Sequence, residues 1–141
     1  KQNGKDDFTK CPNGAPGVET RMPIVFSEGV SKGRLSLNEF AAVTSTNPAK
    51  IFGMYPKKGV LAPGSDADIV LMNPDMEVTI TKNILHENVD YTPYEGIQVK
   101  GWPVMTMVRG QAVVENERLQ VPLGFGRYIN RKPVKYTELL K

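Results

Sequence analysis

The chain has 141 residues, which fits a single domain of ordinary size or a piece of a larger protein. Its composition, 40% hydrophobic and 23% charged, lies near the globular average and excludes wholesale disorder and fibrous repeats. The net charge of +3 is too small to indicate nucleic acid, and no run of roughly 18 apolar residues is present. We therefore expect neither a nucleic acid nor a membrane as a partner.

The N-terminal residues Lys1–Lys5 include neither an initiator Met nor the apolar core of a signal peptide. They resemble the middle of a loop, and we expect the chain to be a fragment of a longer protein. The single cysteine, Cys11, excludes an intrachain disulfide and favours a reducing compartment. We therefore expect a cytoplasmic location.

The first third of the chain is predicted to be a loop followed by short helices. Residues 1–20 are polar and rich in Gly and Pro, with turn signals at Asn13-Gly14 and Pro16-Gly17. The apolar stretch Met22–Phe26 can open either a short helix or a strand.

Ser36 and Glu39 fit a capping box, in which each side chain satisfies a free amide of the other residue, and a helix is expected over 37–43. Asn47-Pro48 predicts a second helix start, with Asn47 as N-cap and Pro48 at the first helical position. This second helix is expected to stop at Gly53.

After Tyr55-Pro56 the apolar pattern changes from helical to extended. Residues 82–96 are expected to be an irregular connection that holds Tyr91 and Tyr94, and Arg109-Gly110-Gln111 is expected to turn a hairpin. The predicted strands are Val60-Leu61, Ile69–Met72, Val78–Thr81, Ile97–Lys100, Val104–Arg109 and Ala112–Glu115.

No segment carries the residue spacing of a metal or acid–base site. The only histidine is His86, and a lone histidine in a connecting segment is interpreted as a solvated loop residue. Asp66 and Asp68 are compatible with a cation pair, but they lie in a tight turn that enters a strand. In such turns Asp side chains commonly bind backbone amides, so the structural interpretation is favoured.

The loop from Cys11 to Arg21 contains two successive turns that expose backbone N–H and C=O groups, and Asn13 can adopt a left-handed conformation. Such a surface suits a planar amide or imide, which needs one donor and one acceptor side by side. The alternative is a structural double turn in which Glu19 and Arg21 form an ion pair. Composition alone favours this structural alternative.

Together with later segments, this loop resembles that of hydantoinases and dihydropyrimidinases, which are cyclic-amide hydrolases of the amidohydrolase superfamily. The resemblance covers nearly the whole chain in order, and its last two segments match this branch of the superfamily specifically. The segments are Asn13-Gly14-x-Pro16-Gly17-x-Glu19-x-Arg21, Thr44–Gly53, Lys58–Val70, Asn88–Gly96 and Val99–Pro103.

The resemblance implies an α/β parent, a TIM-like barrel plus a β-sandwich, of which this chain would be the C-terminal third. The fragment itself would be α+β. Residues 1–55 would end the barrel with its substrate loop and helices, 56–120 would supply sandwich strands, and 121–141 would form a basic C-terminal arm. The resemblance also implies two zinc ions held by histidines, an aspartate and a carboxylated lysine, all upstream of residue 1. The fragment alone would then contain no metal ligand and no catalytic residue.

By resemblance, Asn13 is a substrate-binding residue, because its backbone is expected to hold the ring amide of a cyclic amide or imide. Gly14 lies beside it and is expected to permit close approach of the ring. Glu19 and Arg21 match the same motif and are interpreted as braces of the loop.

From Arg118 onward six cations stand against the single carboxylate Glu138, a local net charge of +5. Aromatic and aliphatic residues alternate with these cations, which favours an arm packed on a protein surface over a patch for RNA or an anionic membrane. The resembled family commonly forms tetramers through such extensions, and we expect a homo-oligomer joined by this arm.

Three functions stay open at this point. The first is a hydantoinase or dihydropyrimidinase. The second is a non-catalytic, dihydropyrimidinase-like scaffold that binds a protein partner, but such relatives typically alter the segments Asn13–Gly17 and Asp90–Tyr94. The third, allantoinase or dihydroorotase, fits the superfamily motifs but not the segment from Asn88 to Pro103.

Overall fold

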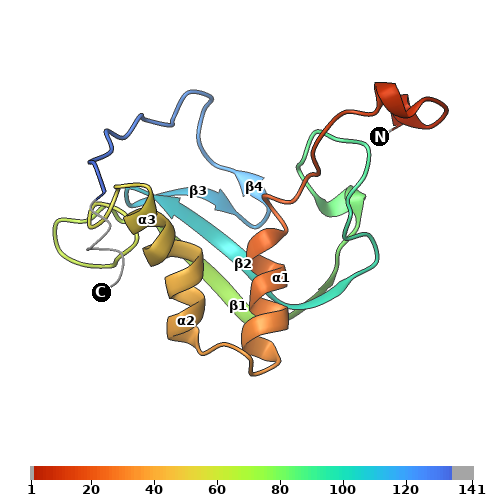
Figure 1. Ribbon diagram of the computed structural model, residues 1–141. Coiled ribbons are helices and arrows are strands. Elements are labelled where there is room, and N and C mark those ends of the chain that lie inside the picture. Colours follow the sequence, from red (N-terminus) through yellow and green to blue (C-terminus); the bar gives the residue numbers. More distant parts are fainter. Residues whose placement is uncertain (1, 135–141) are drawn as a thin grey trace.

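The computed structural model describes residues 2–134. The helices α1, α2 and α3 lie across one face of a four-stranded antiparallel sheet, with irregular segments extending from it (Figure 1). The strands are ordered β1-β2-β3-β4, so each strand pairs with its neighbour in the chain. The α+β architecture expected for the chain is confirmed. No helix within residues 2–134 has the length and apolar character needed to cross a membrane.

The helical segments begin directly after the N-terminal loop. α1 spans Arg21–Val25 and continues as a π-helical turn over Phe26–Ser31, so this apolar stretch is a helix and not a strand. α2 spans Leu37–Ala41 and starts with the predicted capping box. The Ser36 hydroxyl accepts the Glu39 amide at 3.2 Å, and the Glu39 carboxylate accepts the Ser36 amide at 2.8 Å. Hydrogen bonds from the Ser36 backbone and hydroxyl lower the pKa of Glu39.

Asn47 is not the N-cap that the sequence predicts, although Pro48 lies in the first turn of α3 as expected. α2 passes through a π-helical turn over Ala42–Thr46 directly into α3, which spans Asn47–Ile51, and no side-chain cap marks the junction. Pro48 has no amide hydrogen to donate and its ring crowds the preceding turn, and the wider π-helical turn accommodates both effects. Gly53, with a φ of 68°, follows the end of α3 as predicted.

The sheet has fewer and longer strands than the sequence pattern predicts. β1 spans Ile69–Thr79 and β2 spans Gln98–Val108, so each of them joins two predicted segments. β3 spans Gln111–Glu115 and β4 spans Arg118–Leu119. Val60-Leu61 is not a strand.

The segment Asn73-Pro74-Asp75, whose residues are typical of turns, lies in a bulge inside β1. Between the pairs Asn73–Trp102 and Glu77–Lys100, β1 contains more residues than β2, and the register shifts. The Asn73 side chain accepts the Asp75 amide at 3.1 Å, which is the hydrogen bond of a turn. The turn chemistry is therefore present, but pairing with β2 on both sides keeps the strand continuous.

Two-residue turns join β2 to β3 and β3 to β4. Arg109 and Gly110, with φ values of 52° and 79°, form the predicted hairpin turn. Asn116 and Glu117, with φ values of 49° and 61°, form a second such turn, which the sequence pattern did not predict. Glutamate is rare in this left-handed region, so the sequence gives little sign of this turn.

The apolar core attaches the sheet to α1 and to the 82–96 connection. Ile80 is completely buried at its centre, and Trp102 is 7% exposed. Leu85 and Val99 complete the buried cluster, and the partly buried side chains packed against it are Ile24, Met76, Val78 and Tyr94. Because these residues come from a helix, two strands and the connection, one cluster holds all of these elements together.

A second contact holds the helices to the sheet at Gly101 of β2. The rings of Phe26 and Phe40 meet edge to face, with centroids 5.3 Å apart. Phe26 also lies against Gly101, where a Cβ atom would overlap its ring. Gly101 has a φ of 101°. The helix can approach β2 this closely only because position 101 has no side chain.

The C-terminal arm folds back on the body of the molecule in the part that the structure describes. The Arg109 guanidinium lies 4.4 Å from the centroid of the Phe125 ring and donates to the Phe125 carbonyl at 2.9 Å. Further along, the Lys132 amide donates to the Gly53 carbonyl at 2.9 Å. Residues 135–141 of the predicted arm lie outside the described residues.

Candidate functional site

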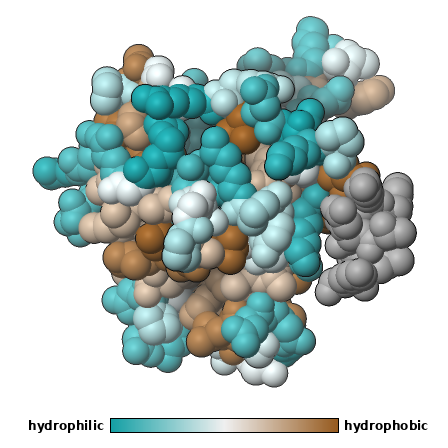
Figure 2. All heavy atoms as spheres, turned by 90° about the vertical axis from the view of Figure 1, so that its left-hand side faces the viewer, coloured by the Kyte–Doolittle hydropathy of each residue, from teal (hydrophilic) through white to brown (hydrophobic). Residues whose placement is uncertain are grey.

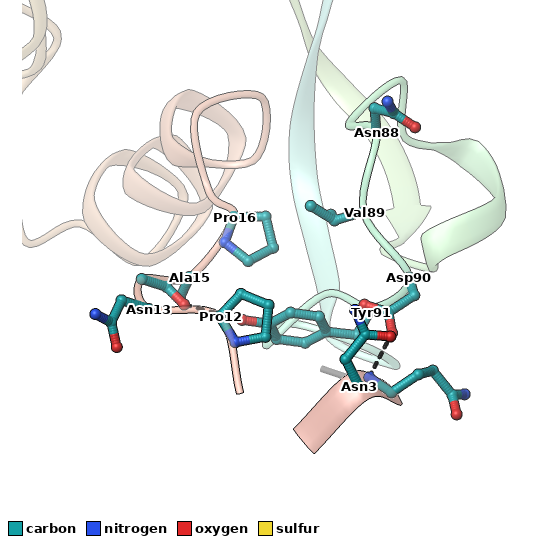
Figure 3. A pocket seen from close by; sticks show the side chains of 11 residues that line it. Asn3, Pro12, Asn13, Ala15, Pro16, Asn88, Val89, Asp90 and Tyr91 are labelled. Carbon is teal, nitrogen blue, oxygen red and sulfur yellow. Dashed lines mark hydrogen bonds between the residues drawn. The ribbon is translucent and has the colours of Figure 1, made fainter. Parts of the chain in front are cut away.

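An open pocket of about 700 Å³ lies where the N-terminal loop meets the 82–96 connection (Figure 3). Its apolar walls are proline rings, Val89 and the Tyr91 ring, and its polar groups are loop backbone and short amide or carboxylate side chains. A small ring with polar edges fits such a lining. The lining residues are Gln2, Asn3, Pro12, Asn13, Gly14, Ala15, Pro16, Asn88, Val89, Asp90 and Tyr91.

Polar contacts hold the two sides of this pocket together. The Tyr91 hydroxyl donates to the Gly14 carbonyl at 3.3 Å, and the backbone amide of Gln2 donates to the Asp90 carboxylate at 2.7 Å. Gly17 lies against the Tyr94 ring, where a Cβ would be 3.5 Å from Cε2. The loop that carries the predicted site is therefore placed by the 88–94 segment.

Asn13 and Gly14 lie at the rim of the pocket and are exposed. The left-handed residue of this turn is Gly14, with a φ of 81°, and not Asn13 as the sequence suggested. No atom lies within 4 Å of the position that a Gly14 Cβ would occupy, so the glycine serves the backbone conformation. Figure 3 shows the Asn13 side chain directed away from Val89 and Asp90. The loop thus offers backbone groups, rather than this side-chain amide, to a ligand.

Glu19 binds His86 in an arrangement that the sequence did not reveal. One carboxylate oxygen lies 2.8 Å from His86 Nδ1, and the other accepts the His86 backbone amide at 2.8 Å. The Glu19 amide also donates to the Glu87 carboxylate at 3.4 Å. The interpretation of Glu19 as a loop brace is confirmed, but its partner is His86 and not Arg21.

His86 is more than the solvated loop residue expected, although 65% of its side chain is exposed. Its Nε2 atom lies 3.2 Å from the Glu117 carbonyl in the β3–β4 turn. The hydrogen bond that the imidazole donates to Glu19 and the negative charge of Glu19 raise the pKa of His86, whereas burial opposes this shift. The ring therefore connects the loop to the sheet through two partners.

Asp66 and Asp68 serve the structure of the turn before β1, as expected. Asp68 accepts the Arg109 amide at 2.9 Å, which connects this turn to the β2–β3 hairpin. Both carboxylates also bind the largely buried Lys58 ammonium, Asp66 at 2.9 Å. Burial lowers the pKa of Lys58, but the hydrogen bonds to the two carboxylates outweigh it, so the net pKa is raised. The cation that the two carboxylates bind is therefore the Lys58 ammonium of the protein itself.

Within residues 2–134, no three side chains of His, Cys, Asp or Glu gather closely enough to hold a metal ion. Zinc centres in proteins require three or four such ligands around one point. The donor groups of the described residues therefore do not fit the two-zinc centre that the resemblance implies.

Known proteins show the same combination of loop, helices and sheet. The family model described as "Amidohydrolase family" matches residues 11–113. The chain belongs to the amidohydrolase family. The D-hydantoinase of Geobacillus stearothermophilus is 46% identical over 140 residues, which are 99% of this chain and 29% of the relative. The amidohydrolase chain described here therefore spans about 29% of the length of such relatives.

Solved structures of relatives share its fold. The dihydropyrimidinase from Brevibacillus agri NCHU1002 is 51% identical, with a TM-score of 0.90 over 96% of this chain and 29% of the relative. The L-hydantoinase (dihydropyrimidinase) from Arthrobacter aurescens is 42% identical, with a TM-score of 0.84 over 93% of this chain and 29% of the relative. The resemblance identified from the motifs is confirmed.

The sequence predicts one side of the pocket and not the other. Asn13 and Gly14 are predicted site residues, whereas Val89, Asp90 and Tyr91 line the opposite side without having been predicted as site residues. The available signal for them is the segment Asn88–Gly96, which contains all three and matches the hydantoinase and dihydropyrimidinase branch specifically.

Proposed function

We propose that this amidohydrolase chain is the C-terminal part of a hydrolase that opens the cyclic amide bond of hydantoins or dihydropyrimidines. The observation that carries the proposal is the pocket in which the Asn13–Pro16 loop meets Val89–Tyr91. Relatives named hydantoinase or dihydropyrimidinase, 42–51% identical, support it. These substrates are small rings with an N–H donor beside a C=O acceptor, which an exposed loop backbone can bind.

The reaction centre in this proposal lies outside the chain, with two zinc ions held by histidines, an aspartate and a carboxylated lysine. Residues 1–55 would end the barrel and 56–120 would belong to the sandwich. The chain covers only 29% of the length of the D-hydantoinase relative, which supports a longer protein. A cytoplasmic location, favoured by the single cysteine, belongs to the same proposal.

The substitution Asn13→Pro in the longer protein tests the substrate role of the loop. Proline removes a backbone donor and restricts φ, so binding of the ring amide should be lost. One such hydrogen bond contributes about 0.5–1.5 kcal/mol, and distortion of the turn adds to the loss. We expect kcat/KM for hydantoin or dihydrouracil to fall at least about tenfold, with zinc content unchanged.

The matched control is Asn13→Ala, which removes the side chain and keeps the backbone donor. It should leave kcat/KM near that of the unmodified protein, since the Asn13 side chain is directed away from Val89 and Asp90 on the opposite side of the pocket (Figure 3). Unchanged kinetics in Asn13→Pro would remove the loop from the site. A longer protein that contains no zinc and hydrolyses neither ring would instead support the scaffold alternative.

We also propose that the C-terminal arm joins subunits, as a homo-oligomer that we expect to be a tetramer. Leu123 and Tyr128 of the arm are 97% and 85% exposed, although neighbouring arm residues are attached to the body. Figure 2, which views the molecule from the side of α3 and the arm, shows apolar surface gathered across this face. A groove of about 910 Å³ between the helices, β1 and the arm adds to it. Apolar surface of this extent favours a protein partner.

Deletion of residues 122–141 from the longer protein tests the arm. We expect smaller species by mass measurement in solution at both low and high salt, because apolar contacts survive ionic screening. The double variant Leu123→Ser and Tyr128→Ser should give the same result while retaining the cations. An oligomer of unchanged mass in both variants would refute the arm as a subunit contact.

A further inference from the structure

The contact between Glu19 and His86 joins residues that are 67 positions apart in the sequence. The carboxylate binds the imidazole ring with one oxygen and the backbone amide of the same residue with the other, each at 2.8 Å. This two-point contact restrains the direction of the Glu19 side chain as well as its distance. Glu19 lies two residues beyond Gly17, where the pocket loop rests on Tyr94.

The same histidine is also attached to the sheet. His86 Nε2 lies 3.2 Å from the carbonyl of Glu117, which is in the tight turn between β3 and β4. Leu85, the residue before His86, is part of the buried core. The Glu19–His86 clamp therefore ties the loop to elements whose positions the core determines.

We propose that Glu19 is a positioning residue of the cyclic-amide site: through His86 it sets the placement of the Asn13–Pro16 loop against Val89–Tyr91. This inference rests on the proposed function and names a residue that would not touch the substrate. The clamp lies outside the pocket lining, so Glu19 acts on the ring amide only through the loop that it holds.

The charges around His86 make the clamp dependent on pH. Carboxylates reach it from each neighbouring element: Glu19 from the loop and Glu117 from the β3–β4 turn, with Glu87 next to it in the connection. Hydrogen bonding and attraction to Glu19 raise the pKa of His86. The charged clamp is therefore fully formed below the ordinary histidine value of about 6.5 and weakens as the pH rises through the higher value of the folded protein.

The test is steady-state kinetics of the longer protein with hydantoin or dihydrouracil as substrate, in the variants Glu19→Gln and His86→Gln. Each variant should raise KM about three- to fivefold while kcat changes less than about 1.5-fold, because the loop binds the ring and does not perform the chemistry. The double variant should be no worse than either single one, since both remove the same contact. Between about pH 6 and pH 8.5, KM of the unmodified protein should rise more than KM of either variant.

The matched control is Glu28→Gln, which removes a carboxylate that pairs with Lys32 at 2.6 Å and lies outside the pocket lining. It should leave KM, kcat and their pH dependence unchanged. Equal effects of Glu19→Gln and Glu28→Gln would overturn the inference. Additive effects of Glu19→Gln and His86→Gln, or a loss confined to kcat, would overturn it as well.

Hydrogen exchange separates this inference from the proposed function. Amides of residues 13–19 should exchange faster in Glu19→Gln than in the unmodified protein, and Glu28→Gln should show no change there. Suppose that the unmodified protein hydrolyses neither ring, but the amides of residues 13–19 exchange faster in Glu19→Gln. The proposed function then fails, and with it the role of Glu19 in that reaction, whereas the structural clamp between Glu19 and His86 is supported. If hydrolysis occurs and Glu19→Gln alters neither KM nor exchange, the positioning role alone is overturned.

Discussion

The body of the molecule and the pocket side are held together by different interactions. The body relies on buried apolar contacts, with Ile80 and Trp102 in one cluster and Phe26 against Gly101 in another. The pocket side relies on a few hydrogen bonds between exposed segments: the Tyr91 hydroxyl donates to Gly14, and His86 donates to the Glu19 carboxylate. Changes in the body should therefore affect the free energy of unfolding, whereas changes at the pocket should affect ligand binding more than stability.

Loss of core packing should produce the largest effect on stability. The substitution Ile80→Ala removes a completely buried side chain and should lower the free energy of unfolding by about 2–5 kcal/mol. The control Ile51→Ala, at a residue that is 57% exposed on α3, should change it by about 0.5 kcal/mol. Denaturant unfolding measures both, and a small effect of Ile80→Ala would break the distinction between body and pocket.

A methyl group at position 101 should have the next largest effect. Gly101→Ala places a Cβ in the Phe26 ring and puts alanine at a φ of 101°, so strain and overpacking add to about 3 kcal/mol. In Gly64→Ala the φ of 91° is similar but no atom lies within 4 Å of the new Cβ, and we expect about 1 kcal/mol from strain alone. If Gly101→Ala and Gly64→Ala lowered the unfolding midpoint equally, the close contact of Phe26 with position 101 would contribute nothing to the loss of stability.

The Glu19–His86 clamp should have the smallest effect on stability. Because the folded protein raises the pKa of His86, the stabilisation is present below about pH 6.5 and disappears as the pH rises through the folded value. Solvent screens this exposed pair, so its contribution should be below about 1 kcal/mol. The stability difference between the unmodified protein and His86→Gln, measured by denaturant unfolding, should narrow from about pH 5.5 to pH 9. A difference that widened with pH would contradict the assigned direction.

The parts of the fold that depend on interactions between neighbouring residues could be predicted from the sequence. The Ser36–Glu39 capping box and the Arg109-Gly110 hairpin depend on residues next to each other in the chain, and both are present. Asn47-Pro48 has the same local signature as a helix start, yet the helix continues through it. Tertiary packing of the continuous helix outweighs this helix-start signature, because the intrinsic preference of single residues for a helix start or interior is weak.

The candidate site was predictable only on the side where the motif is continuous. Asn13 and Gly14 lie in one short loop, whereas the partners Tyr91 and His86 lie more than 60 residues away. Spacing rules apply along one helix, strand or turn and do not report which loops the topology brings together. The sequence therefore predicts a solvated His86, although two partners hold its ring.

The bulge in β1 has a consequence for the outer edge of the sheet. β1 is the first strand of the four-stranded sheet in the described residues, so one row of its backbone groups points away from β2. Pro74 has no amide hydrogen, and the amide of Asp75 is already bound by the Asn73 side chain. A second strand that approached from outside would find no continuous ladder through these residues. Within the described residues, the bulge therefore interrupts the outer edge of an eleven-residue strand and disfavours pairing of another strand along that edge.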